Sequence, residues 1–279
     1  MTNIISFLTD FGTTDTSVGQ CKGVIAGIAP KASVIDLTHA VPHFDIATGS
    51  WLLRQAVPHF PPCVHVAVVD PGVGTARRPI AVECARGDVL IGPDNGLLLA
   101  AVEALGGVKT VVQLADPKFR HHPVSNTFHA RDIFCPAAAH ITHGVSIHML
   151  GPTLDKATLV ALPPPRVEVR DGVLHTAVAS INEYGSLALT APGTRLADLG
   201  SPARVRVSLE GRAFEARVVQ TFGDAAQGET VLLVDSYGQL CLAINQGDLG
   251  ATLALDRSAR PALTIERPVH PTEVQPGDS

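Results

Sequence analysis

Two segments of the sequence place an aspartate at the end of an apolar run, and the first lies near the start of the chain. Asp10 closes the run Ile4–Thr9, and Asp15 and Ser17 follow at the start of a predicted helix. In open α/β sheets, ligands bind at the carboxyl ends of strands. A carboxylate there can accept two hydrogen bonds from a diol such as ribose, but the same residues can also form a turn that caps the helix.

The second segment, VVDPGVGTARRPI, covers residues 68–80. Asp70 ends a predicted strand, and Gly72 and Gly74 permit tight backbone conformations after it. Arg77 lies within reach of a loop that folds back. Such a loop can cradle an anion or only connect two strands. It lacks the Lys-Ser/Thr ending of a P-loop, and no G-x-G-x-x-G follows a predicted strand, which argues against an ordinary nicotinamide enzyme.

A third segment, NTFHARDIF, holds a histidine among charged residues. His129, Arg131 and Asp132 stand just before an alanine-rich helix. Histidine is the side chain best suited to accept a proton near neutral pH. A lone histidine in a loop is more often a structural hydrogen-bond partner, so its type alone leaves the role open.

Neither a metal site nor a disulfide framework is indicated by the remaining histidines and cysteines. His140 and His143 lie three residues apart, but no acidic partner has ligand-like spacing, so we assign no metal and no cofactor. The five cysteines are irregularly spaced and contain no C-x-x-C. We expect reduced, mostly buried thiols.

The composition narrows the class of protein. Hydrophobic residues make up 46% and aromatic residues 4%, with 25 Gly and 21 Pro, which favours aliphatic strands joined by turns over a helical bundle. A net charge of −5 without a Lys/Arg cluster argues against nucleic acid as a partner. The start of the chain does not look like a signal peptide, and no apolar run approaches the roughly 20 residues that span a bilayer. We expect a soluble, cytoplasmic protein without membrane contact.

The first half of the chain alternates strand-like and helix-like segments. The predicted strands are Ile4–Thr9, Val34–Leu37, Val64–Val69, Ile80–Glu83 and Val89–Ile91. The predicted helices are Ser17–Ile28, Asp45–Val57, Leu97–Leu105 and Pro136–His143. Near-continuous apolar strands are typical of a sheet that helices cover on both faces. We predict an α/β domain with a mainly parallel sheet over residues 1–162.

The pattern changes after three consecutive prolines, which predict a stiff linker over residues 163–166. The runs beyond it alternate apolar and polar residues, and they are Val167–Val169, Val173–Val178, Val205–Leu209, Phe214–Val219, Thr230–Val234 and Leu240–Ile244. Asp171-Gly172 and Glu210-Gly211 are typical of hairpin turns. We predict a small all-β, barrel-like domain over residues 167–266, followed by a flexible tail over residues 267–279.

Taken together, these segments resemble one family: the adenosine-forming S-adenosylmethionine (SAM) hydrolases, or SAM hydroxide adenosyltransferases, which are related to fluorinase and chlorinase. The resemblance runs from about Asn3 to Gly247 and is carried by TDFGTTDTSVGQCKG, VVDPGVG-x-x-R, PDNGLL and FHARDIF. It implies an α/β domain followed by a small β-barrel. It also implies a homotrimer in which each site lies between one subunit's first domain and a neighbour's barrel.

The resemblance further implies hydrolysis of S-adenosyl-L-methionine to adenosine and L-methionine, with water attacking C5′. The hydrolase branch uses an Asp–Arg–His set, which corresponds here to Asp70, Arg77 and His129. The halogenating relatives have Tyr, Thr and Tyr there, with an inserted loop before P-x-N-G-L-L that this chain lacks. Asp70 and His129 are expected to orient and deprotonate the water while Arg77 holds Asp70. Which of the two takes the proton stays open, because a coupled pair titrates together.

Substrate contacts are implied for a larger set of residues. They are Asp10 and Phe44 at the ribose, Asp15, Ser17, Asn182 and Ser236 at the methionine end, Tyr184, Ser186, Phe222 and Gln246 at adenine, and Asn95 of PDNGLL. Asn182 stands where an Asp commonly meets the methionine ammonium, so charge pairing with the ammonium is lost. Ser186 replaces a common Asn. Tyr184 and Phe222 can also be interpreted as barrel core.

Three other functions are compatible with parts of this pattern. The Asn182 and Ser186 departures favour an adenosyl-nucleoside binding protein with little catalysis. A halide-using adenosyl transferase is disfavoured by Arg77 and His129, and chloride-dependent formation of 5′-chloro-5′-deoxyadenosine would reveal it. A metal-dependent hydrolase of another substrate is suggested only by the 12 histidines.

Overall fold

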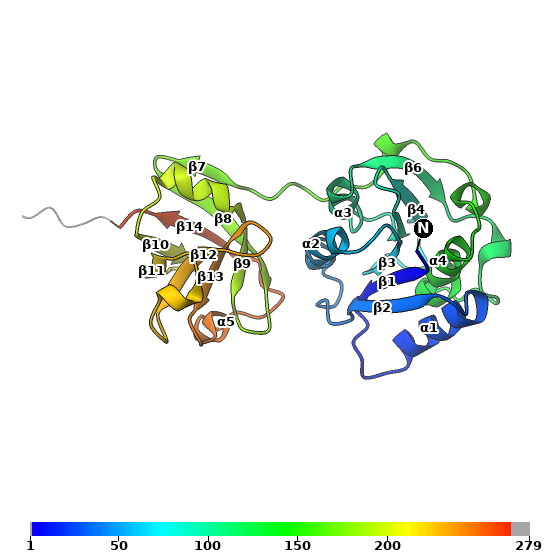
Figure 1. Cartoon of the computed structure of the whole chain (residues 1–279), viewed down its shortest axis with the longest axis horizontal. Coiled ribbons are helices and arrows are strands. Elements are labelled where there is room, and N and C mark those ends of the chain that lie inside the picture. The colour runs from blue at the N-terminus through cyan, green and yellow to red at the C-terminus, as the bar shows by residue number, and fades with distance from the viewer. Residues whose placement is uncertain (1, 269–279) are drawn as a thin grey trace, which may run out of the picture. The chain divides into compact units, whose positions relative to one another are not determined.

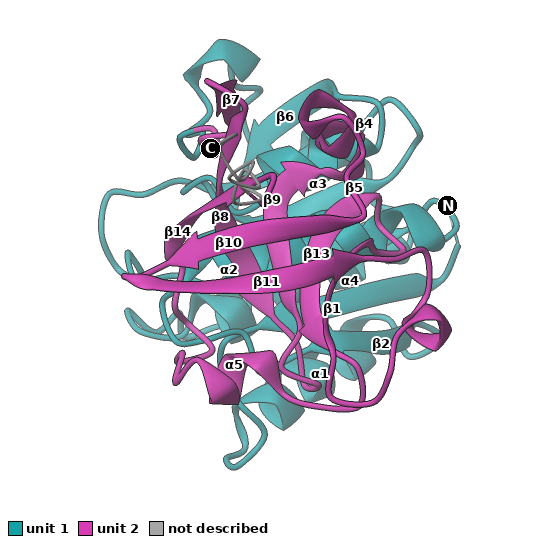
Figure 2. Cartoon of the chain, turned by 90° about the vertical axis from the view of Figure 1, so that its left-hand side faces the viewer, with its two compact units in different colours: residues 1–163 teal, residues 164–279 magenta. Residues whose placement is uncertain are grey.

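The computed structural model describes residues 2–268 and divides into two compact units, residues 1–163 and 164–279 (Figures 1 and 2). The division falls inside the run of three prolines. From residue 269 on, the predicted tail lies outside the described residues. None of the helices within residues 2–268 has the length and apolar character needed to cross a membrane.

A six-stranded sheet forms the centre of the first unit. Its strands are β1 (Ile4–Thr9), β2 (Ser33–Thr38), β3 (Val64–Val68), β4 (Pro79–Cys84), β5 (Val89–Pro93) and β6 (Val108–Gln113). The order is β2-β1-β3-β5-β4-β6, in which β2, β1, β3 and β5 are parallel and β4 runs antiparallel to both neighbours. The predicted α/β fold with a mainly parallel sheet is confirmed. Strand β6 was not predicted, because Lys109 and Thr110 interrupt the apolar run of this half-exposed edge strand.

Helices cover both faces of this sheet (Figure 1). They are α1 (Ser17–Ile28), α2 (Ile46–Ala56), α3 (Leu99–Ala104) and α4 (Cys135–Thr142), with short turns η1 (Val57–His59), η2 (Pro117–Phe119), η4 (Ile147–Leu150) and η5 (Lys156–Thr158). Phe7 of β1 packs in one core with α1 and α4, and its neighbour Leu8 packs in the other with α2 and α3. Successive strand residues thus enter different cores, which is why the strands are apolar throughout.

The second unit is a closed barrel. Its strands are β7 (Glu168–Arg170), β8 (Val173–Ile181), β9 (Leu187–Pro192), β10 (Arg204–Leu209), β11 (Arg212–Val218), β12 (Thr230–Val234), β13 (Gln239–Ile244) and β14 (Ala262–Glu266). The order is β14-β10-β11-β12-β13-β9-β8-β7, and β14 also pairs with β8, so seven strands form a ring and β7 extends it. The short helices are η6 (Gly193–Leu199), η7 (Phe222–Asp224) and α5 (Leu249–Thr252). The predicted barrel-like domain is confirmed.

Both predicted hairpin turns of the barrel are present. Asp171-Gly172 joins β7 to β8 and Glu210-Gly211 joins β10 to β11, with positive φ at all four positions. Strands β9 and β14 were not predicted, because their alternation is carried partly by small side chains, and because β9 ends at Pro192 and β14 follows Pro261. They supply the pairings β9–β13 and β14–β8 that complete the ring.

Candidate active site

The loop after β3 brings Asp70 and Arg77 into direct contact. Arg77 Nε donates to Asp70 Oδ1 at 2.9 Å and to Oδ2 at 3.0 Å, and Nη2 also donates to Oδ2. The two side chains are only 6% and 9% exposed. Arg77 Nη2 also lies 2.9 Å from Nδ1 of His129, so hydrogen bonds connect the three predicted residues in the order Asp70, Arg77, His129. Because a guanidinium nitrogen can only donate, Nδ1 of His129 accepts, and a neutral ring then carries its proton on Nε2.

The surroundings of His129 favour this neutral ring. The pKa of His129 lies below its ordinary value, first because burial disfavours the charged form and then because Arg77 stands beside it. The charge of Arg120 lowers this pKa further, whereas Asp70 and Asp132 act in the opposite direction. The hydrogen bond from Arg77 and the lowered pKa therefore agree on the protonation state.

Gly74 allows the loop after β3 to approach the segment before His129. Its φ is +77°, and a Cβ placed on it would lie 2.5 Å from the backbone oxygen of Asn126. Only glycine fits this contact without displacing one of the loops. Arg77 is fixed from a further side, because its guanidinium carbon lies 5.1 Å from the ring centroid of the buried Phe134.

A π-helical turn, η3 (Ala130–Phe134), follows His129 directly and continues into α4. Within it, the Cys135 amide donates to the Ala130 carbonyl, five residues back. Such turns occur often at functional sites. Here the turn gives His129 a fixed position at the start of a buried helical segment.

Asp10 lies at the same edge of the sheet, because Thr9 of β1 pairs in register with Val68 of β3. Its Oδ2 accepts the Phe44 amide at 2.9 Å, while Oδ1 has no hydrogen bond from the described residues. The Phe44 ring is 70% exposed on a backbone with φ +65°. A free carboxylate oxygen beside an exposed ring is suited to a sugar with two hydroxyls.

Two histidines that showed no pattern in the sequence support the Asp10 loop. His43 Nδ1 lies 2.8 Å from the Asp10 carbonyl oxygen. His39 lies 2.8 Å from the Thr9 hydroxyl through Nδ1, and its carbonyl accepts the Gly12 amide at 2.7 Å. The signal available in the sequence was that His39 lies two residues after the predicted strand Val34–Leu37. It became informative only once that strand was known to pair with β1.

Asp15, Ser17 and Asn95 have local partners. Asp15 Oδ1 accepts the Ser17 amide at 2.8 Å, as in a turn that starts a helix. The Asn95 amide group donates to the Val69 carbonyl at 2.9 Å and its oxygen accepts the Leu97 amide at 3.2 Å. Asn95 thereby fixes the chain next to Asp70. Substrate roles for all three stay predictions.

In the barrel, the turn between β8 and β9 presents exposed groups. Asn182 Oδ1 accepts the amides of Tyr184 and Ser186, each at 3.0 Å, so this oxygen holds the turn. Tyr184 is 81% exposed and Phe222 is 43% exposed. Neither ring belongs to the barrel core.

The barrel residues fall into two groups. Gln246 follows β13 near the Asn182 turn, since the Gly250 amide donates to the Gly185 carbonyl. The turn of Phe222 lies at this end too, because Asn245 Nδ2 donates to the Ala225 carbonyl at 2.8 Å. Ser236 lies in the β12–β13 turn at the opposite end of β13. A ligand that contacts both groups has to extend along this strand.

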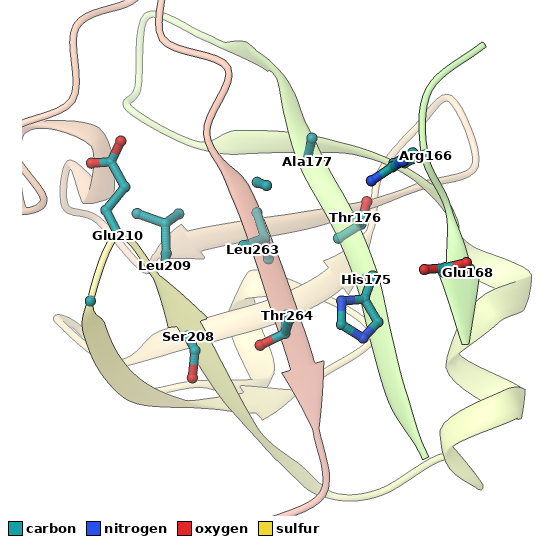
Figure 3. Close-up of a pocket in the computed structure, with 12 residues that line it drawn as sticks. Arg166, Glu168, His175, Thr176, Ala177, Ser208, Leu209, Glu210, Leu263 and Thr264 are labelled. Atoms are coloured by element: carbon teal, nitrogen blue, oxygen red, sulfur yellow. The ribbon is translucent and has the colours of Figure 1, made fainter. Parts of the chain in front are cut away.

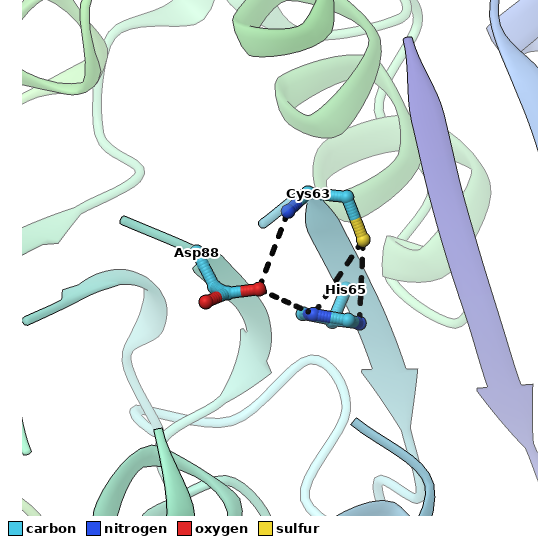
Figure 4. Close-up of side chains that lie close together, drawn as sticks. All are labelled: Cys63, His65 and Asp88. Carbon is cyan, nitrogen blue, oxygen red and sulfur yellow. Dashed lines mark hydrogen bonds and ion pairs between the residues drawn. The ribbon is translucent and has the colours of Figure 1, made fainter. Parts of the chain in front are cut away.

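One cluster outside the predicted site contains metal-ligand residue types: Cys63, His65 and Asp88 (Figure 4). Asp88 Oδ1 lies within hydrogen-bond distance of the Cys63 amide at 3.2 Å, of His65 Nε2 at 3.1 Å and of Arg86 Nη2 at 2.9 Å. His65 Nδ1 lies 2.7 Å from the Ser6 hydroxyl. Burial raises the pKa of the Cys63 thiol to about 12, which keeps it protonated. The protein's own donors occupy this cluster, and we interpret it as structural.

A groove of about 370 Å³ lies on the barrel (Figure 3). One cross-strand row of polar residues, Glu168, His175, Thr264 and Ser208, forms part of its lining. None of the predicted site residues lines it.

Comparisons with known proteins identify the family of this chain. The model of the SAM hydroxide adenosyltransferase N-terminal domain matches residues 5–151, and that of the C-terminal domain matches residues 176–260. The (R)-S-adenosyl-L-methionine hydrolase of Salinispora tropica is 46% identical over 243 residues, which cover 87% of this chain and 90% of that protein. A fluorinase from Actinoplanes is 29% identical over 291 residues, covering 94% and 96%.

The fold is shared with a solved structure as well. An uncharacterized conserved protein from Thermotoga maritima superposes with a TM-score of 0.88 at 33% identity, over 94% of this chain and 100% of that one. Two family models cover both units, and a relative well above 30% identity spans most of the sequence. The chain belongs to the SAM hydroxide adenosyltransferase family.

Proposed function

We propose that this protein is an enzyme that hydrolyses S-adenosyl-L-methionine to adenosine and L-methionine. The observation that carries the proposal is the hydrogen-bonded chain Asp70–Arg77–His129 at the carboxyl edge of the sheet. Relatives named (R)-S-adenosyl-L-methionine hydrolase at 46% and 36% identity support it. The reaction needs no cofactor, because the sulfonium of the substrate is itself a good leaving group.

The chemistry requires a water molecule held in line with the C5′–S bond. The C5′–O bond forms as the C5′–S bond breaks, and the bonding pair leaves with sulfur as the thioether of methionine. Alignment at about 3–3.5 Å is the main requirement for such a displacement. The product is first a protonated alcohol, which is a far stronger acid than a carboxylic acid.

The hydrogen bonds suggest a role for each residue. Nδ1 of His129 is occupied by Arg77, so Nε2–H is the group that can donate to the water oxygen and hold it. Asp70 accepts the proton released as the C5′–O bond forms and passes it to solvent. A carboxylate is a weak base in general, but a protonated alcohol is acidic enough to give its proton to one. Arg77 keeps both partners in one arrangement.

We further propose that the free Asp10 oxygen binds the ribose hydroxyls and that the exposed aromatic residues Phe44, Tyr184 and Phe222 pack on the nucleoside. Exposure of these rings fits a homotrimer in which a neighbour's barrel completes the site. The five free, buried thiols fit the reducing cytoplasm.

The test is hydrolysis by the purified, chelator-treated protein in ¹⁸O-labelled water. Both sulfonium epimers are supplied, since the relatives' name specifies the (R) form. We expect equal amounts of adenosine and methionine, with the label on O5′ of adenosine, and a sharp loss in His129→Ala. Intact substrate with retained binding would favour the binding protein instead. Loss of activity to the chelator would favour a metal-dependent enzyme, and 5′-chloro-5′-deoxyadenosine in chloride would favour the halide-using transferase.

A further inference from the structure

Asp132 carries a buried carboxylate to which the proposed reaction gives no role. It is 0% exposed. Its Oδ1 accepts Arg131 Nε at 2.7 Å, and its Oδ2 accepts Arg131 Nη2 at 3.0 Å and the Ser125 amide at 2.8 Å. Burial alone would raise the pKa of Asp132, but the hydrogen bonds from Arg131 and Ser125 outweigh it and leave this pKa below its ordinary value. The group is therefore a fixed negative charge.

This one residue holds the segment that leads to His129, residues 121–128, which we name the strap. The Asp132 carbonyl accepts the His121 amide at 2.9 Å, at the start of the strap. Its carboxylate accepts the Ser125 amide in the middle. Its own amide donates to the Phe128 carbonyl at 3.2 Å, at the end.

Both halves of the site rest on the strap. Asn126 is the strap residue against which Gly74, in the loop after β3, packs. The Phe128 ring contacts Phe11, the neighbour of Asp10, with 5.9 Å between centroids. The guanidinium carbon of Arg131 lies 4.9 Å from the Phe128 ring centroid. A shift of the strap therefore moves His129 relative to Arg77.

We infer that Asp132 is a positioning residue, which fixes the strap so that Nδ1 of His129 meets Arg77. The inference rests on the proposed function for its kinetic consequences. The inference also predicts the His129–Arg77 hydrogen bond and the tautomer of His129 that this bond selects. Both can be measured without any substrate.

The chain offers a matched control for loss of a buried carboxylate. Asp88 is also 0% exposed, is paired with a nearby arginine, Arg86, and accepts a backbone amide, but it precedes β5 at the other end of the sheet. Asp132→Asn and Asp88→Asn should both lower the melting temperature. Only Asp132→Asn should reduce kcat, by roughly 10- to 100-fold with KM little changed, because a displacement of about 1 Å costs about that much.

The pH profile gives a readout that a purely structural role would not move. The charged groups facing His129 are Arg77, Arg120, Asp70 and Asp132. Removing the Asp132 charge removes an influence that raises the pKa of His129, so the acid limb of kcat should move to lower pH. The ¹⁵N imidazole shifts of His129 should show the same change, together with a weakened preference for the Nε2–H tautomer.

The outcomes separate the inference from the proposed function. Wild-type kcat, pH profile and ¹⁵N shifts in folded Asp132→Asn would overturn the inference, as would equal kcat losses in Asp88→Asn. If Asp132→Asn does not fold, Arg131→Gln keeps the Ser125 hydrogen bond and should show a smaller kcat loss in the same direction, and an unchanged kcat there would overturn the inference. Absence of hydrolysis in the wild type would remove the proposed function, while the ¹⁵N comparison would still decide the role of Asp132.

Discussion

Strand β3 has a histidine, an aspartate and an arginine near each of its ends. At the amino end, His65, Asp88 and Arg86 form a network in which the histidine and aspartate side chains are 0% exposed. At the carboxyl end, His129 is joined to Asp70 and Arg77 on a partly open edge. The same three residue types thus occur twice in one domain, about one strand length apart.

The two groups differ in how many of their side-chain atoms remain free to form hydrogen bonds. At the amino end, both His65 nitrogens have protein partners and Asp88 Oδ1 receives three donors. At the carboxyl end, Nε2 of His129 has no hydrogen-bond partner among the described residues. Residue type and proximity therefore do not distinguish the two groups, whereas unused hydrogen-bonding capacity near solvent does.

The largest expected effect concerns the group at the carboxyl end of β3, where Nε2 of His129 is free. His129→Ala should lower kcat by roughly 10²- to 10⁴-fold, because it removes the donor that holds the water and leaves Arg77 without this partner. The melting temperature should stay within a few degrees of wild type. Steady-state kinetics and a thermal melt measure both, and a large fall in melting temperature with kcat preserved would reverse the roles of the two ends.

At the amino end of β3, a substitution should lower the stability of the protein and leave kcat unchanged. His65→Ala leaves the buried Ser6 hydroxyl without its partner and removes one of the three donors to Asp88 Oδ1, at a cost of about 3 kcal/mol of folding free energy. Chemical denaturation followed by circular dichroism measures this cost. At a temperature where the variant is folded, kcat should equal that of wild type, and a substantial kcat loss would show that the two ends are coupled.

A pair of glycines sharpens the comparison. Gly74→Ala drives a Cβ into the Asn126 carbonyl at the open end, and kcat should fall about tenfold through the misplaced strap. Gly87 also has positive φ but nothing within 4 Å of an added Cβ, and it lies beside Asp88. Gly87→Ala should therefore cost only about 1 kcal/mol of stability and leave kcat unchanged. Equal kcat values for the two variants would argue against the loop contact.

The smallest effect concerns the charge around His129. Arg120 lowers the pKa of His129, so Arg120→Gln should let this pKa rise towards its ordinary value. The active form is neutral, and activity is lost as pH falls through this pKa. The acid limb of the kcat profile should therefore shift to higher pH in the variant. A shift to lower pH would contradict the arrangement of charges around the ring.

The sequence predicted the elements that rest on local patterns. Ser17–Ile28 and Ile4–Thr9 match α1 and β1, and the hairpin turns at Gly172 and Gly211 follow from local backbone preferences. Asp70, Arg77 and His129 were grouped by resemblance, since 52 residues separate Arg77 from His129. Geometry then gave the tautomer of His129.

What the sequence did not predict depends on pairing between distant segments. His39 supports the Asp10 loop only because β2 lies beside β1. Asp132 holds the strap through backbone groups of His121 and Ser125, which any residue type supplies. A motif marks such positions as special but does not show what they contact.

The closure of the barrel by β14 has a consequence for synthesis of the protein. Residues 262–266 pair with β10 on one side and with β8 on the other. During synthesis, these edges of β10 and β8 therefore stay unpaired until β14 has left the ribosome. The first unit has its whole sheet available about a hundred residues earlier. Unpaired strand edges recruit other chains. A nascent chain interrupted before β14 therefore carries a complete first unit joined to an open sheet that favours aggregation.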